Sequence, residues 1–326
     1  LAAFRAWLDK ENCVVAGING FPFGPFHGQA VKDNVFAPDW CEAPRLEYTN
    51  RLFDLLAAFG PPDKVGTVST LPGSFKGFGR TPDELKVMRR NLLACAEHLA
   101  RLRDRTGTHL RLALEPEPIG HAENTPEALR LFEQLRAEEP AKGLVDAHLG
   151  IAYDTCHFAL QYEEAHEAIA RLNAGGAPVL KFHLSSARRL KPTEVALARL
   201  AKRHEPVYLH QTMGRAKDGS IVRFKDIPLA MAAIDQLRTL EELRVHFHVP
   251  VNADHLSDEL STTNDHLRDA IAVIGKNPGR YRELEIETYT WEVLPAEVRT
   301  ADVADMIAAE YRWTLAELAK AGVKPL

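Results

Sequence analysis

Acidic and histidine side chains end several short apolar runs of the sequence. Glu115 ends HLRLALE, Asp154 ends LGIAYD, His183 ends VLKFH and Glu287 ends LEIE. Successive side chains of an extended strand point to opposite faces. The bulky residues of each run therefore share one face, which suits packing under helices, and the ionisable residue lies on the other face.

These four side chains form a donor set that suits a divalent cation. Burying an isolated carboxylate is strongly unfavourable, and one cation can offset that cost for several carboxylates. Two glutamates, an aspartate and an imidazole make an oxygen-rich set, which suits Mn²⁺, Mg²⁺ or Co²⁺ and leaves Zn²⁺ open. We therefore predict a metal site formed by Glu115, Asp154, His183 and Glu287.

Each predicted ligand also has an ordinary structural role open to it. Asp154 could cap the helix that follows, and Glu115 in EPEP could be an exposed loop residue. His183 could be a hydrogen-bonded core histidine, and Glu287 could form a salt bridge with Lys181. Five runs agree in their parity, because VHFHV also turns its two histidines to the ionisable face, and this agreement favours the metal site.

Other side chains could bind a second metal or the substrate. His157 follows Asp154 by one helical turn and would face the same cavity. The further candidates for a second metal or for substrate contact are His246, His248, Arg188, Lys181 and His27. Lys181, His27, Arg80 and Lys76 are candidate anion contacts, and a structural role is open for each.

The elements that must position these residues alternate regularly along the chain. The expected strands are Cys13–Asn19, Lys64–Thr70, His109–Glu115, Leu149–Asp154, Val179–His183, Val245–Val249 and Leu284–Glu287. A helix is expected over Thr81–Arg103, with Thr81 as N-cap and Pro82 at its first position, and NTPEALRLFEQLR starts the same way at Thr125. This alternation predicts a (β/α)8 barrel in a single domain covering residues 1–326, with its active site at the carboxyl ends of the strands.

Two stretches interrupt the alternation, and the strand count is one short of a closed barrel. Residues 205–224 predict a hairpin insertion around a Lys-Asp-Gly turn. Residues 18–40 form a long Gly-, Pro- and aromatic-rich loop of the kind that often carries function. We expect the first strand of the barrel to be missing from this chain.

Composition limits the classes of partner. A formal net charge of −5 gives no general electrostatic reason to bind nucleic acid or an anionic membrane. No apolar stretch is long enough to span a bilayer, and the four scattered cysteines indicate neither a disulfide framework nor a zinc knuckle. We expect a cytoplasmic protein that acts on a small polar metabolite.

In its order of ligands the chain resembles the xylose isomerase-like TIM-barrel superfamily, which includes sugar epimerases and multi-zinc abasic-site endonucleases. The resemblance rests on a Glu after the fourth strand, Asp-x-x-His after the fifth, His after the sixth and Glu after the eighth. It implies that Glu115 and Glu287 flank the substrate carbon, one removing a proton and the other returning it. It also implies that Arg188 holds a substrate hydroxyl.

Over nearly its whole length the chain is similar to the EboE family of ebo-cluster barrel proteins, described as metabolite traffic proteins. The segments that carry this similarity are INGFPFGPFHGQAVKDNVFAPDW, STLPGSF, LEPEP, YDTCHFAL, YLHQT, FHVPV and LEIETYTW. The family implies an additional N-terminal segment with the first strand, and partner proteins from the ebo cluster.

Three functions remain open at this point. A sugar, cyclitol or sugar phosphate isomerase or epimerase needs one metal ion. A multi-zinc phosphoesterase needs two or three metal ions, with His157, His246 and His248 as added ligands. His246 and His248 are candidates for this role because they occupy a place like the Asp-x-His of the endonucleases. A metabolite-binding protein would hold its ligand without turning it over.

Overall fold

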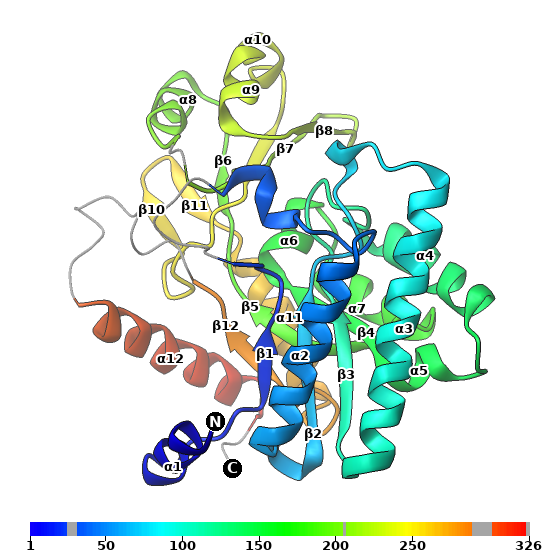
Figure 1. The fold of residues 1–326 in the computed structure, drawn as a ribbon. Coiled ribbons are helices and arrows are strands. Elements are labelled where there is room, and N and C mark those ends of the chain that lie inside the picture. The colour runs from blue at the N-terminus through cyan, green and yellow to red at the C-terminus, as the bar shows by residue number, and fades with distance from the viewer. Residues whose placement is uncertain (25–30, 205–206, 289–301, 324–326) are drawn as a thin grey trace. The chain divides into compact units, whose positions relative to one another are not determined.

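The computed structural model describes residues 1–24, 31–204, 207–288 and 302–323 (Figure 1). The chain divides into two compact units. Unit 1 consists of Leu1–Phe26, Asp33–Ala152 and Leu172–Lys181. Unit 2 consists of His27–Lys32, Tyr153–Arg171 and Phe182–Leu326. Strands β4 and β5 begin in unit 1 and end in unit 2. The single domain expected from the sequence stays a prediction.

Parallel strands form the sheet of unit 1. They are β1 (Gly17–Asn19), β2 (Val65–Thr70), β3 (His109–Leu114) and β4 (Leu149–Asp154). Each pairs in parallel with the next one along the chain. The expected strands are confirmed to within about one residue, except that β1 is shorter than Cys13–Asn19, because only its last three residues pair with β2.

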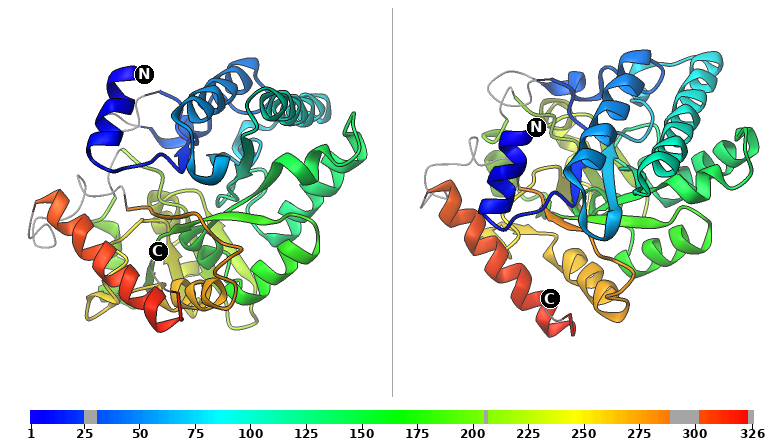
Figure 2. Two further views of the ribbon diagram at one scale, coloured as in Figure 1. Left: turned by 90° about the horizontal axis from the view of Figure 1, so that it is seen from below. Right: turned by 60° about the horizontal axis from the view of Figure 1, so that its bottom comes forward.

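One helix precedes these strands, and others connect them. They are α1 (Ala2–Lys10), α2 (Ala43–Phe59), α3 (Pro82–Thr106), α4 (Thr125–Glu138) and α5 (Leu144–His148), with 3-10 turns η1 (Lys32–Phe36), η2 (Pro62–Lys64) and η3 (Lys76–Phe78). Helices α2 and α3 pack side by side and contact β2 and β3, respectively (Figure 2).

The helix starts follow local capping chemistry. Thr81 accepts a hydrogen bond from Glu84 N, and the Glu84 side chain accepts one from Thr81 N, so the predicted N-cap is confirmed as a full capping box. At α4 the cap is Asn124, one residue earlier than the sequence indicated, because its side chain accepts from Glu127 N.

Unit 2 contains a parallel strand pair and four helices beside it. The second half of β5 (Val179–Leu184) pairs in parallel with β12 (Leu284–Ile286), which confirms both expected strands. The helices are α6 (Thr155–Leu160), α7 (Ala165–Ala174), α11 (Asn264–Lys276) and α12 (Val303–Lys320).

Unit 2 also holds an antiparallel sheet, which we call sheet 2. Its strands are β6 (Arg188–Leu190), β7 (Thr212–Arg215), β8 (Ile221–Phe224), β9 (Glu242–Val245), β10 (His255–Ser257) and β11 (Leu260–Thr262), in the order β10-β11-β6-β9-β7-β8. Strands β7 and β8 confirm the predicted hairpin. Buried apolar side chains of β6 and β9 pack with those of α8 (Glu194–Ala201), α9 (Ile227–Ala232) and α10 (Ile234–Leu237).

The expected strand Val245–Val249 is wrong. The strand here is β9, which ends at Val245 and is antiparallel to both of its neighbours, β6 and β7. Strand β7 pairs with residues 242–245 and β6 with residues 243–245, so the ladder lies earlier in the chain than the apolar alternation suggested. His246 and His248 therefore follow a strand of sheet 2.

Within the described ranges, no helix has both the length and the apolar composition that crossing a membrane requires.

Candidate metal centre

Asp154 ends β4 and begins α6. Its Oδ1 accepts hydrogen bonds from His157 N at 2.9 Å and from Ser185 Oγ at 2.7 Å, so the capping role considered from the sequence is confirmed. Its Oδ2 is buried and accepts no hydrogen bond from the described residues. The ring nitrogens His183 Nδ1 and His248 Nε2 lie 4.0 and 3.9 Å from Oδ2. Capping thus uses one oxygen and leaves the other directed at two imidazoles.

The electrostatic environment keeps Asp154 ionised. Burial raises the pKa of this carboxyl, but the positive charge that His157, His248 and His183 carry when they are protonated outweighs burial and holds the pKa well below its usual range. A buried carboxylate in such surroundings is a strong ligand for a cation.

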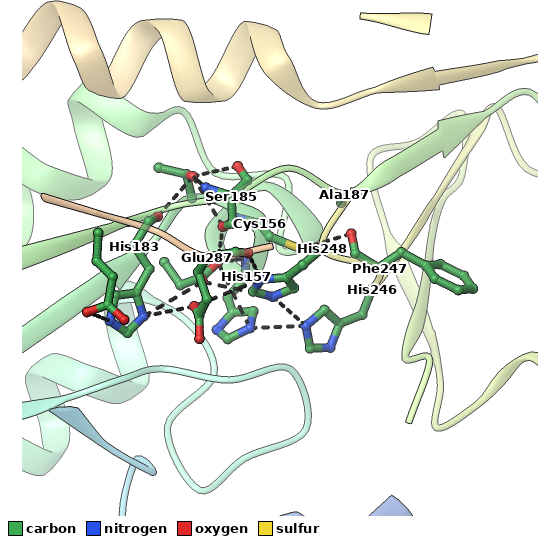
Figure 3. A network of polar contacts seen from close by, with 12 residues as sticks. Cys156, His157, His183, Ser185, Ala187, His246, Phe247, His248 and Glu287 are labelled. Carbon is green, nitrogen blue, oxygen red and sulfur yellow. Dashed lines mark hydrogen bonds and ion pairs between the residues drawn. The ribbon is translucent and has the colours of Figure 1, made fainter. Parts of the chain in front are cut away.

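His183 and Glu287 come together because β5 and β12 are paired. Glu285 lies opposite His183 in the register, and Glu287 N, just beyond the strand, donates to Leu184 O at 3.1 Å. The Oε2 atom of Glu287 lies 3.0 Å from Nδ1 of the fully buried His183. Asp154, His183 and Glu287 each offer one ligand atom within 4.8 Å of the others, and Figure 3 shows His183 and Glu287 side by side.

Three of the four predicted ligands are thus assembled within unit 2. The fourth, Glu115, directly follows β3 in unit 1, where its backbone N donates to Thr70 O at 2.9 Å. Its side chain is only 2 % exposed, so the interpretation as an exposed loop residue is wrong. Its place in the metal centre stays a prediction. Lys181 is fully buried in unit 1, and its predicted roles are likewise untested.

Three imidazoles of unit 2 converge beside Asp154. The Nε2 atom of His246 lies 3.2 Å from His157 Nε2 and 3.0 Å from His248 Nε2. All three side chains are buried, and we call them the imidazole cluster. Figure 3 shows their rings directed toward one another.

The outer contacts of the imidazole cluster fix two of its tautomers. His248 Nδ1 lies 2.7 Å from the carbonyl oxygen of Glu287, and His246 Nδ1 lies 2.5 Å from Gln211 Oε1. Both partners accept hydrogen bonds, so each Nδ1 carries the hydrogen and each neutral ring presents a lone pair at Nε2. Burial lowers the pKa of His246 well below its usual value. A proton shared between His246 and a neighbouring imidazole is therefore disfavoured. Two ring nitrogens 3.0 Å apart are spaced as adjacent ligands of one cation would be.

Sequence patterns missed two members of this neighbourhood. Gln211 precedes β7 and orients His246, as second-shell groups orient metal-binding histidines. Cys156 lies between Asp154 and His157 in the chain and can offer Sγ together with His246 and His248. The position of Cys156 inside the Asp-x-x-His motif was the one sequence feature that pointed to it.

The other candidates have contacts of different kinds, and the substrate role predicted for Arg188 stays a prediction. The Arg188 guanidinium stacks on the Phe247 ring, 3.7 Å from its centroid. Lys76 and Arg80 are held in unit 1 by carboxylates, which confirms a structural role for both. These ion pairs are Lys76–Glu123, Lys76–Glu127, Arg80–Asp39, Arg80–Glu42 and Arg80–Glu84. His27 lies outside the described residues.

Comparison with known proteins establishes the fold. No protein-family model and no curated protein matches the chain. A solved structure described as a D-tagatose 3-epimerase-like protein aligns with a TM-score of 0.50 and 10 % identity, over 99 % of this chain and 84 % of that one. This likeness shows a TIM-barrel fold of the α/β class. The fold class predicted from the sequence is confirmed.

A second solved structure, the apo form of 3-keto-D-glucoside 4-epimerase from E. coli, aligns less well. Its TM-score is 0.35 at 17 % identity, over 55 % of this chain and 62 % of that one. An alignment of this quality carries no structural argument.

Proposed function

We propose that the protein is a divalent-metal-dependent isomerase or epimerase of a small sugar, cyclitol or sugar phosphate. The observation that carries this proposal is the convergence of Asp154, His183 and Glu287, whose ligand atoms lie within 4.8 Å of one another. The likeness to a D-tagatose 3-epimerase-like structure supports the fold on which such a site can be built.

The donor set fits a divalent cation. Asp154 Oδ2 is buried without a hydrogen-bond donor among the described residues, and the Glu287 carboxylate lies beside His183. We assign Asp154, His183 and Glu287 as ligands and add Glu115 as the proposed fourth, for Mn²⁺, Mg²⁺ or Co²⁺, with Zn²⁺ also compatible. When bound, the ion would act as a Lewis acid that polarises a substrate carbonyl.

The protein's own groups would then move the proton. In the proposed reaction, one glutamate takes the proton from the carbon next to the carbonyl, and the other returns a proton to the same or the adjacent carbon. Glu287 fits one role because its carboxylate is only partly exposed and contacts His183 Nδ1 at 3.0 Å. Glu115 is proposed for the other, and His157 for a substrate oxygen.

Metal stoichiometry and proton exchange test this proposal together. Elemental analysis of the wild type should find about one divalent ion per chain, and Asp154→Ala and His183→Ala should both lose it. His166→Ala is the matched control, because His166 is an exposed histidine paired with Asp269 away from these ligands. Incubation of the wild type with ketoses and cyclitols in D2O should place deuterium at the reacting carbon. Glu287→Gln should abolish that exchange, with metal binding retained or weakened. Absence of metal at saturating concentration would overturn the proposal.

A second candidate is a metal-dependent phosphoesterase, and the imidazole cluster favours it. His157, His246 and His248 offer a nitrogen-rich donor set beside the first, and two-metal sites activate water for hydrolysis. Two or three zinc ions per chain, with release of inorganic phosphate from small phosphoesters, would favour this candidate over the isomerase. One ion and deuterium exchange would reject it.

The similarity to the EboE family suggests the biological setting. We propose a cytoplasmic role in metabolite biosynthesis or traffic, with ebo-cluster proteins as partners. A purely metabolite-binding role would require that ligand affinity survive both Glu115→Gln and Glu287→Gln while the wild type shows no turnover.

A further inference from the structure

Arg188 is a buried cation with unused hydrogen-bond donors. Its side chain is 6 % exposed, and its Nε and Nη1 atoms have no acceptor among the described residues. The neighbouring arginines differ, because Arg189 pairs with Asp265 and Arg199 pairs with Glu259. No carboxylate of the described chain pairs with Arg188, although a buried charge normally requires a partner.

The strand register places Arg188 on a definite face of sheet 2. Arg188 lies opposite Val245 in the antiparallel pair of β6 and β9, so the two side chains share a face. The guanidinium stacks on Phe247, two residues beyond Val245, at 3.7 Å from the ring centroid. His210 also stacks on Phe247, with centroids 3.7 Å apart.

This face is not the one that carries the imidazole cluster. Figure 3 shows the Phe247 ring pointing away from the rings of His246 and His248, which flank it in the chain. Arg188 shares its face with Val245, so it lies on the side where sheet 2 packs with apolar residues of α8 to α10.

The charges around Arg188 favour a bound anion. Arg203 acts on Arg188 as a like charge, and burial together with Arg203 lowers the pKa of Arg188 to about 9. The Phe247 ring stabilises a guanidinium through its face but accepts nothing from the N–H groups. An oxyanion supplies both missing elements, the negative charge and the acceptors.

We propose that Arg188 is the centre of an oxyanion site that holds the phosphate group of a small phosphorylated metabolite. Arg203 adds a second positive charge, and Phe247 fixes the plane of the guanidinium. The small exposed fraction of Arg188 excludes a polymer such as nucleic acid as the source of the anion. Because Phe247 is the residue between His246 and His248, an anion held here also restrains the segment that carries the imidazole cluster.

Thermal unfolding with inorganic phosphate as the probe tests this site. The wild type should show a saturable rise in melting temperature with phosphate, and isothermal calorimetry should give about one site per chain. Arg188→Met should lose the phosphate response, with at least ~10-fold weaker binding. In phosphate-free buffer Arg188→Met should be no less stable than the wild type, because an apolar side chain replaces an uncompensated buried charge. Arg189→Gln, which removes the neighbouring charge on the opposite face, is the matched control and should keep the response.

The outcomes separate a binding role from a structural one. A phosphate response of equal size in the wild type and Arg188→Met, or no saturable binding in the wild type, would overturn the proposal. A loss of stability in phosphate-free Arg188→Met would also overturn it, by showing that Arg188 serves the fold. If Arg188→Met does not fold, Arg188→Lys keeps the charge without the planar fork, and unchanged phosphate binding in that variant would count against the site. Equal responses to acetate and phosphate would show that any oxyanion suffices and would reject phosphate as the specific ligand.

Discussion

Asp154 is expected to serve the fold through one carboxylate oxygen and the metal through the other, and two substitutions can separate these roles. Oδ1 accepts from His157 N and Ser185 Oγ, whereas Oδ2 faces His183 and His248. Asparagine keeps an oxygen for the two hydrogen bonds and removes the charge. Alanine removes both functions.

The structure sets the expected magnitudes. Asp154→Ala deletes the N-cap of α6, which costs ~1 kcal/mol. It also leaves the buried Ser185 hydroxyl without its Asp154 acceptor, which costs a further ~1–3 kcal/mol. We therefore expect the free energy of unfolding to fall by about 2–4 kcal/mol in the metal-free alanine variant. Asparagine caps helices about as well as aspartate, so Asp154→Asn should cost less than ~1 kcal/mol.

Metal affinity should follow a different order. Loss of an outer-shell partner typically weakens metal binding 10- to 100-fold, so loss of a charged ligand should weaken it by ~100-fold or more in both variants. The assay is urea unfolding in excess chelator at pH 8, followed by metal titration of the folded protein. Wild-type metal affinity in Asp154→Asn would refute the ligand assignment. Wild-type stability in metal-free Asp154→Ala would refute the capping argument.

Three further predictions concern stability. Burial lowers the pKa of His266 to about 4, so the native state resists protonation and stability should fall by roughly 3 kcal/mol as the pH drops from about 6.5 to about 4. His266→Gln should flatten this slope in unfolding curves measured across that range, and an unchanged slope would contradict the assignment. Thr81→Ala should lower the free energy of unfolding by ~1 kcal/mol through loss of the capping box, while Thr81→Ser should not, as measured by urea unfolding. Gly150→Ala should cost ~1–3 kcal/mol in the same assay, because a Cβ there would lie 2.4 Å from Leu180 Cγ and 2.5 Å from Pro178 O; a neutral effect would show that this contact relaxes.

Local periodicity was enough to find most of the candidate ligands. Asp154, His183 and Glu287 were predicted from alternation within short apolar runs, and the structure brings these three together. Thr81 was identified as a cap from the residues that follow it, and the structure shows the full capping box. Such features depend on the dihedral angles and side-chain directions of neighbouring residues, which the sequence specifies directly.

Pairing between distant segments was not predictable in the same way. The alternation of apolar and polar residues around Val245 is the same in a parallel and an antiparallel strand. Only the pairing with β6 and β7 places β9 in sheet 2. The orientation of His246 by Gln211 likewise joins residues 35 positions apart.

The sequence by itself determined which side chains share a face in most strands, where the helices begin and the barrel class of the fold. Only the tertiary structure decided that the two oxygens of Asp154 have different surroundings, that His157, His246 and His248 converge, and that Arg188 stacks on Phe247. The physical reason is that strand and helix periodicity arises from the local backbone. The charge, hydrogen-bond partner and ligand of a buried group come instead from segments that only folding brings into contact.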